Sequence, residues 1–181
     1  FGIYRRILFH RAAAIIAYGT ATRRHLIDLG IAEDKIFSGT QVIPAEQLPP
    51  PAVDKNILGL GDKNLVLSVN YLVPRKGLDT LIRAFQRVAG DKDVLALVGS
   101  GPEEERLRRL AGGSDQILFP GYQSGEDKTS WYAAADIFVF PTLHDPWGLV
   151  VNEAMAFGLP IITTDAAGCA LDLVQDNGLV I

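Results

Sequence analysis

The chain has 181 residues, of which 48% are hydrophobic and 21% are charged, a composition ordinary for a globular protein with one well-packed domain and an appended segment. Its net charge of −4 argues against nucleic acid as the main partner. One cysteine excludes an internal disulfide and fits a reducing compartment. With one cysteine and three scattered histidines we expect no zinc site, and no apolar run is long enough to predict a membrane span.

The first 48 residues predict a short α/β segment. Residues 1–11 are apolar and basic, which fits either an ordinary helix with a solvated basic face or a helix that lies on a membrane surface. The remaining elements expected here are a strand over 12–18, a helix capped by Thr20 or Thr22 that runs to Leu29 and ends at Gly30, and an extended segment over 35–43.

A proline-rich stretch over 44–51 separates this segment from the rest of the chain. Four of its eight residues are proline, which is typical of a stiff linker. We therefore place a domain boundary here, with one unit over residues 1–48 and a second over residues 49–181.

The second unit alternates short apolar runs with helical patterns. Strands are predicted over 65–69, 94–98, 117–119, 137–140, 160–163 and 179–181, helices over 78–89, 103–111, 129–135 and 149–157, and a short helix or turn over 172–175. This alternation is typical of βαβ units, and it predicts an α/β fold with a Rossmann-like, doubly wound parallel sheet. Ligands of such sheets bind beyond the carboxyl ends of the strands.

One such strand end carries two acids around a helix start. Asp145 precedes a turn at Gly148, and Glu153 lies inside the helix that follows. The first N–H groups of a helix and its dipole attract anions, so the turn is a natural phosphate site. Asp145 could instead cap the turn and Glu153 could be a solvated helix position, but an acid among so many apolar neighbours needs a partner or a function.

The segment Asp145-Pro146-Trp147-Gly148-Leu149-Val150, followed by Glu153-Ala154-Met155-Ala156, resembles the Glu-x7-Glu signature of the family-4 retaining glycosyltransferases, which have the GT-B fold. The resemblance extends from about Ala12 to Ile181, and it departs from the family at Asp145, where the family usually has Glu. It implies that Glu153 binds the ribose hydroxyls of the donor, that the N–H groups of Gly148, Leu149 and Val150 bind its diphosphate, and that Asp145 contacts its sugar.

Two adjacent cations, Arg75 and Lys76, stand on a loop before a helix. Alone they fit a solvated basic turn as well as a diphosphate site. The same family has a Pro-x-Lys-Gly segment whose lysine holds the donor phosphates, and the resemblance carries this role to Lys76, with Arg75 as its helper. Tyr71 stands where the family often has an arginine.

Three further positions are candidates for donor binding. Gly99 belongs to a Gly-Ser-Gly-Pro turn that three glutamates follow, so it favours a tight turn over a phosphate loop; in the family this turn faces the cleft. Tyr122 is either a core residue or, by the resemblance, a residue whose backbone meets the nucleotide base. Thr142 precedes the first acid. The sequence Asp91-Lys92-Asp93 imitates a metal-binding Asp-x-Asp, but it precedes a strand and is better explained as a surface turn.

The resemblance implies the donor-binding domain of a retaining hexosyltransferase of polysaccharide biosynthesis. It would move a sugar from a nucleoside diphosphate sugar to a hydroxyl of a saccharide or lipid-linked acceptor, without metal or other cofactor. We interpret the chain as a fragment whose residues 1–48 end an N-terminal acceptor domain. We expect a cytoplasmic protein, with or without peripheral contact to the inner membrane face. The alternatives are an epimerase or phosphorylase of the same fold, and a non-catalytic nucleotide-sugar-binding module.

Overall fold

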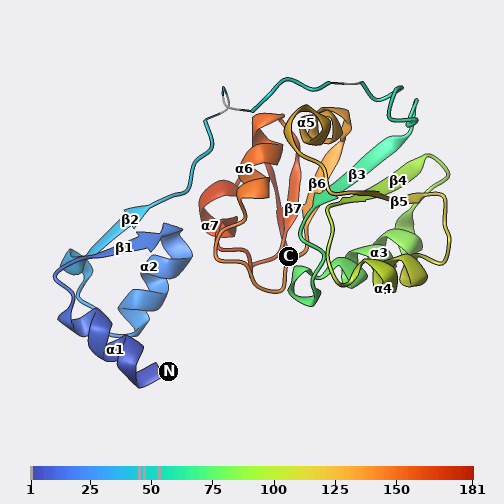
Figure 1. Cartoon of the computed structure of the whole chain (residues 1–181). Coiled ribbons are helices and arrows are strands. Elements are labelled where there is room, and N and C mark those ends of the chain that lie inside the picture. The colour runs from blue at the N-terminus through green and yellow to red at the C-terminus, as the bar shows by residue number, and fades with distance from the viewer. Residues whose placement is uncertain (1, 45, 47, 53) are drawn as a thin grey trace.

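The computed structural model describes residues 2–44, 46, 48–52 and 54–181, and its strands form two parallel sheets. A two-stranded sheet belongs to a small N-terminal unit, and a six-stranded sheet belongs to a larger unit (Figure 1). The segment drawn in teal connects the two units. Residues 45 and 47 of the predicted linker lie outside the described residues.

The small unit is a strand–helix–strand arrangement preceded by a helix. Its elements are α1 (Gly2–Arg11), β1 (Ile15–Tyr18), α2 (Gly19–Asp28), the 3-10 turn η1 (Glu33–Lys35) and β2 (Ile36–Gly39). Strand β1 pairs in parallel with β2, and the buried side chains of this unit are Ala17, Leu26, Ile31 and Ile36. The predicted strand over 12–18 was therefore too long, because pairing is limited to residues 15–18. Within the predicted extended segment over 35–43, residues 36–39 form the paired strand β2.

The predicted cap of α2 is wrong. The helix begins at Gly19, directly after Tyr18, and no side chain of the small unit caps it. Thr20 lies inside the first turn, where its N–H and its hydroxyl both donate to the carboxylate of Asp172, at 2.8 Å and 2.7 Å. The acceptor that satisfies this helix start thus comes from the large unit.

The large unit contains six parallel strands in the order β5-β4-β3-β6-β7-β8. Its elements are β3 (Asn64–Val69), the 3-10 turn η3 (Pro74–Lys76), α3 (Leu78–Val88), β4 (Asp93–Val98), α4 (Glu104–Ala111), β5 (Ile117–Gly121), α5 (Gly125–Ala134), β6 (Ile137–Phe140), α6 (Leu149–Ala156), β7 (Ile161–Thr163), α7 (Ala170–Leu173) and β8 (Gly178–Val180). The chain winds outward from β3 to β5, returns to β6 beside β3, and winds outward again to β8. The predicted α/β, Rossmann-like, doubly wound fold is confirmed.

Helices cover both faces of this sheet. Helices α3 and α4 pack on one face, and α5, α6 and α7 pack on the other (Figure 1). Strand β4 shows why its sequence is an unbroken apolar run: Leu95 and Leu97 belong to the core under α3 and α4, whereas Val94, Ala96 and Val98 belong to the core under α5 and α6. A strand buried on both faces has no polar side.

Two helices of the large unit differ from their predicted bounds by more than one residue. Helix α5 begins at Gly125, four residues before the predicted start at residue 129. The prediction missed these residues because the first turn of the helix is polar and lacks apolar periodicity. The acids Glu126 and Asp127 suit the positive end of the helix dipole instead. The last short helix occupies residues 170–173 and not 172–175. No helix in the described part of the chain combines the length and apolarity needed to cross a membrane.

Candidate functional site

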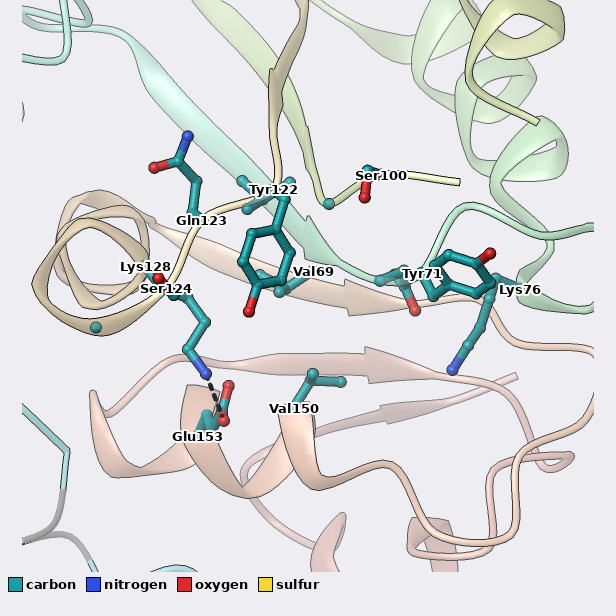
Figure 2. Close-up of a pocket in the computed structure, with 14 residues that line it drawn as sticks. Val69, Tyr71, Lys76, Ser100, Tyr122, Gln123, Ser124, Lys128, Val150 and Glu153 are labelled. Carbon is teal, nitrogen blue, oxygen red and sulfur yellow. Dashed lines mark hydrogen bonds and ion pairs between the residues drawn. The ribbon is translucent and has the colours of Figure 1, made fainter. Parts of the chain in front are cut away.

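A cavity of about 330 Å³ opens at the carboxyl ends of β3 and β4, beside the place where the winding of the sheet reverses. This volume lies in the range of about 300–1,000 Å³ typical of small-molecule sites. Figure 2 shows side chains from β3, α5 and α6 converging on it. Its lining comprises Val69, Asn70, Tyr71, Lys76, Val98, Gly99, Ser100, Tyr122, Gln123, Ser124, Gly125, Lys128, Val150 and Glu153. We call it the Glu153 cavity.

A second cavity of about 260 Å³ adjoins the start of α6. It is lined by Tyr18, Gln41, Lys76, Phe140, Asp145, Pro146, Trp147, Gly148, Leu149 and Val150. We call it the Asp145 cavity. Lys76 and Val150 line both cavities, so the two spaces meet at the helix start. Tyr18 and Gln41 add the small unit to the wall of the Asp145 cavity only.

The start of α6 presents free backbone donors between the two cavities. Gly148 precedes the helix with a φ of 104°, and a Cβ there would lie 2.7 Å from the Phe140 ring. Only glycine adopts this backbone conformation against the ring without strain. The first N–H groups of a helix have no intrahelical partner. Gly148, Leu149 and Val150 therefore lie where the sequence predicted a phosphate site, on the wall of the Asp145 cavity.

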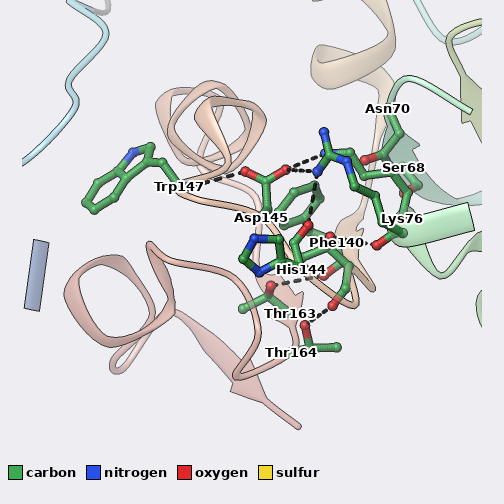
Figure 3. Close-up of polar contacts among 11 residues, drawn as sticks. Ser68, Asn70, Lys76, Phe140, His144, Asp145, Trp147, Thr163 and Thr164 are labelled. Atoms are coloured by element: carbon green, nitrogen blue, oxygen red, sulfur yellow. Dashed lines mark hydrogen bonds and ion pairs between the residues drawn. The ribbon is translucent and has the colours of Figure 1, made fainter. Parts of the chain in front are cut away.

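Lys76 is held against Asp145 at the same place (Figure 3). Its Nζ lies 2.5 Å from Asp145 Oδ2, and Arg75 Nη1 lies 3.2 Å from the same oxygen. The residue is only 8% exposed and its ammonium lies 4.8 Å from the centroid of the Phe140 ring, a cation–π contact. The alternative of a solvated basic turn is therefore wrong for Lys76, although the side chain of Arg75 is half exposed.

Asp145 also makes the turn contact expected of a capping acid. Its Oδ1 accepts the N–H of Trp147 at 3.1 Å, while its Oδ2 receives Lys76. Burial alone would raise its pKa, but the bond and charge of Lys76, the Trp147 N–H and Arg75 together hold the pKa below the usual Asp value. Asp145 is thus an ionised acid that fixes both the turn and the position of Lys76.

Glu153 is a partly buried acid with two partners on α5. Its Oε1 lies 2.8 Å from Lys128 Nζ, and its Oε2 accepts the Tyr132 hydroxyl at 2.7 Å (the Lys128 pair is dashed in Figure 2). An acid among apolar neighbours was predicted to have a partner or a function, and the structure shows two partners. The partners themselves were missed, and their spacing on α5, four residues apart, is the signal that could have indicated a shared helix face.

The remaining candidates take different places. Gly99 lines the Glu153 cavity, where a Cβ would lie 1.7 Å from the Asn70 carbonyl oxygen, so glycine is required by close backbone approach. Tyr122 is 74% exposed and points toward the same cavity in Figure 2, so the alternative of a core residue is wrong. Thr142 is buried, and its hydroxyl donates to the Arg75 carbonyl at 3.1 Å; it supports the cation loop and lines neither cavity.

Asn70 is a further cavity residue that the sequence did not single out. Its Nδ2 donates to Ser68 Oγ at 2.9 Å (both residues are labelled in Figure 3). Ser68 Oγ in turn donates to the Val139 carbonyl at 2.7 Å. Asn70 Oδ1 is the one buried side-chain polar atom without a partner in the described part of the chain. A residue that lines the Glu153 cavity therefore carries a buried acceptor without a partner.

Asp91 and Lys92 form the predicted turn, and Asp93 is the first residue of β4. Lys92 pairs there with Asp62, away from both cavities. Within residues 2–44, 46, 48–52 and 54–181, no group of three or more His, Cys, Asp or Glu side chains is placed to hold a metal ion. That the protein works without metal stays a prediction.

A buried lysine and a free helix start lie beside the reversal of the doubly wound sheet, which is the place where Rossmann-like domains bind their ligands. Comparison with known protein families identifies the family to which this domain belongs. The family described as "Glycosyl transferases group 1" matches residues 52–181, and the chain belongs to this family.

Two curated relatives illustrate the similarity. The lipopolysaccharide core biosynthesis glycosyltransferase LpsE of Rhizobium meliloti is 38% identical over 135 residues, which are 72% of this chain and 38% of the relative. A GDP-mannose-dependent alpha-(1-6)-phosphatidylinositol monomannoside mannosyltransferase of Mycobacterium tuberculosis is 36% identical over 136 residues, 67% of this chain and 35% of the relative. The chain thus spans less than two-fifths of the length of these relatives.

Solved structures agree on the fold. The crystal structure of Anabaena HepE in complex with UDP matches with a TM-score of 0.83 at 24% identity, covering 97% of this chain and 51% of that one. The crystal structure of WaaG, a glycosyltransferase involved in lipopolysaccharide biosynthesis, matches with a TM-score of 0.75 at 21% identity, covering 99% and 52%. The chain therefore has the fold of the corresponding half of GT-B glycosyltransferases.

Proposed function

We propose that the chain is the donor-binding part of a family-4 glycosyltransferase that moves a hexose from a nucleoside diphosphate sugar to an acceptor hydroxyl with retention of configuration. The observation that carries the proposal is the placement of Lys76 and the start of α6 between two adjoining cavities, one bordered by Glu153 and the other by Asp145. A nucleoside diphosphate sugar has the matching order: nucleoside, anionic bridge, sugar.

The nucleoside belongs in the Glu153 cavity. Carboxylates accept hydrogen bonds from hydroxyls, so Glu153 suits the ribose. Tyr122 and Gly99 lie on the same wall and are assigned to the base side of the nucleoside. The sugar belongs in the Asp145 cavity, where an ionised acid can accept a bond from one of its hydroxyls. Thr142 contributes by supporting the loop that carries Arg75.

The chemistry assigned to the helix start is leaving-group stabilisation. When the bond between the anomeric carbon and the diphosphate oxygen breaks, negative charge develops on the diphosphate. Lys76, Arg75 and the N–H groups of Gly148, Leu149 and Val150 stabilise that charge electrostatically, without a metal ion. Asp145 now neutralises Lys76 at 2.5 Å, so a diphosphate has to compete with Asp145 for this cation.

The division of labour between the units is part of the proposal. Residues 1–48 end an acceptor-binding domain and residues 49–181 form the donor-binding domain, with Tyr18 and Gln41 reaching the Asp145 cavity from the first unit. We propose a cytoplasmic enzyme of polysaccharide biosynthesis with a saccharide or lipid-linked acceptor. The exposed face of α1, with Tyr4 and Leu8 beside Arg5, suits contact with the inner face of the membrane.

A two-stage experiment tests the function. First, a thermal-shift panel compares UDP, GDP, ADP and their sugars with the free nucleosides, since a ligand that binds the folded chain stabilises it by mass action. Second, the longer protein is incubated with the stabilising nucleotide sugar and candidate acceptors. We expect the 181-residue chain to bind without transferring, because transfer needs two substrates held in line. Epimerised sugar, sugar phosphate, or no conversion of the donor would each refute transfer.

A further inference from the structure

Both oxygens of the Glu153 carboxylate are engaged by one face of α5. Lys128 and Tyr132 are four residues apart, so they lie on the same side of the helix. One donates to Oε1 at 2.8 Å and the other to Oε2 at 2.7 Å. The two bonds leave the carboxylate little freedom to rotate.

Tyr132 is a fixed, neutral donor. It is fully buried, its ring stacks on Phe157 at a centroid distance of 5.7 Å, and it meets Phe138 at 5.8 Å. Burial, and then the charge and hydrogen bond of Glu153, raise the pKa of Tyr132 well above its usual value. The hydroxyl therefore keeps its proton and points it at Glu153.

Lys128 is placed differently, because its side chain is 26% exposed and lines the cavity. Figure 2 shows its ammonium meeting Glu153 at the cavity edge. An ammonium has three N–H donors and a carboxylate has about four acceptor sites. The two bonds observed leave about two acceptor sites on Glu153, which matches the two O–H donors of a vicinal diol.

We propose that Lys128 and Tyr132 are positioning residues that aim Glu153 at the 2′ and 3′ hydroxyls of the ligand, so that the site selects ribonucleotides over 2′-deoxyribonucleotides. This inference rests on the proposed function, because it takes a nucleoside diphosphate as the ligand. A 2′-deoxy ligand leaves one charge-assisted bond of an oriented carboxylate unmade, whereas a carboxylate that is free to turn discriminates less.

The test is the affinity ratio of UDP to 2′-deoxy-UDP, and of GDP to 2′-deoxy-GDP, measured by titration calorimetry on the full chain. We expect the unmutated chain to bind the ribose form about tenfold more tightly. Tyr132→Phe keeps the ring and removes the hydroxyl donor, and Lys128→Met removes the ammonium and keeps an apolar side chain. Each substitution should reduce the affinity ratio to about two- or threefold, mainly by lowering the affinity for the ribose form. Lys55→Met is the matched control. It breaks an ion pair of similar length and exposure, 2.7 Å and 27%, outside both cavities, and should leave the ratio unchanged.

Two results overturn the inference. An unchanged ratio in both variants, whether the two affinities stay the same or fall by equal factors, means that the α5 side chains do not orient Glu153 toward the ligand; the proposed function survives this result. Failure of the unmutated chain to bind any nucleoside diphosphate overturns the inference and the proposed function together. Circular dichroism checks the fold of each variant. If Tyr132→Phe is unfolded, the ratio of Lys128→Met decides, because that side chain lies outside the core.

Discussion

Replacing Lys76 by Met is the sharpest test of the phosphate assignment. The substitution removes the ammonium and keeps an unbranched apolar side chain of similar length above the Phe140 ring. A hydrogen bond to a charged group contributes about 1.5–3 kcal/mol, or about 10- to 150-fold in Kd. We expect the lower part of this range, because Lys76 already has a bond to Asp145 at 2.5 Å and a diphosphate gains only the difference.

The measurement compares nucleoside diphosphates with the corresponding nucleosides by titration calorimetry. Affinity for the diphosphate should fall, and affinity for the nucleoside should stay nearly constant because it lacks the anionic bridge. Lys92→Met is a matched control: its Nζ also lies 2.5 Å from a carboxylate, that of Asp62, but the side chain is 68% exposed and lies outside both cavities. Equal losses for nucleoside and diphosphate in Lys76→Met would refute the assignment.

The remaining predictions concern three acids. Glu153→Gln should weaken binding of a ribonucleoside diphosphate more than that of its 2′,3′-dideoxy form, as measured by titration calorimetry, because the lost contact exists only where hydroxyls exist. Asp145→Asn should slow sugar transfer by the longer protein more than it weakens binding of the free diphosphate, which lacks the sugar. Urea unfolding should show that Asp145→Asn is less stable than the unmutated chain at neutral pH and nearly as stable at acid pH. The reason is that the pKa of Asp145 is lowered in the folded chain. The ionised carboxylate therefore stabilises the fold above the usual Asp pKa, and this stabilisation disappears as the pH falls through the folded-state pKa. Asp172→Ala should lower the free energy of unfolding by about 1–2 kcal/mol, the usual effect of losing a helix cap.

Each of these predictions can fail in its own way. Identical losses for ribose and dideoxyribose forms would make Glu153 a structural acid. Unchanged transfer and donor affinity in Asp145→Asn would reduce Asp145 to the residue that fixes the turn at Trp147, and a loss of stability independent of pH would show that its charge does not matter. For Asp172→Ala, an unchanged urea midpoint would mean that water replaces the carboxylate at Thr20 without cost.

Much of the large unit could be predicted from its sequence because burial on both faces leaves a plain signal. A run such as Val94–Val98 is apolar at every position only if helices cover both sides of the strand. The proximity of Gly148 and Lys76 was predictable for a related reason: both residues follow strand ends, and in a parallel sheet those ends share one edge. The start of α5 was missed because a polar first turn that suits the helix dipole has no apolar periodicity.

Contacts across long sequence separations could not be predicted from local patterns. The partners of Glu153 lie 25 and 21 residues away on another helix, and the carboxylate that caps α2 lies 152 residues from Thr20. A threonine before an apolar helix is an ordinary capping signal, and only the packing of α2 against α7 shows that the acceptor is supplied from outside.

The packing of α2 against α7 also predicts that a shift of the small unit affects the Asp145 cavity and not the Glu153 cavity. Thr20 is bonded to Asp172, and Asn152 Nδ2 donates to the Gln41 carbonyl at 3.2 Å, while Asn152 Oδ1 accepts the Trp147 ring N–H at 2.9 Å. Trp147 in turn donates its backbone N–H to Asp145. The wall of the Asp145 cavity is thus fixed by both units through these bonds. The Glu153 cavity is lined by the large unit alone. A change that loosens α2 from α7 should therefore disturb the sugar side of the site and leave the ribose side intact.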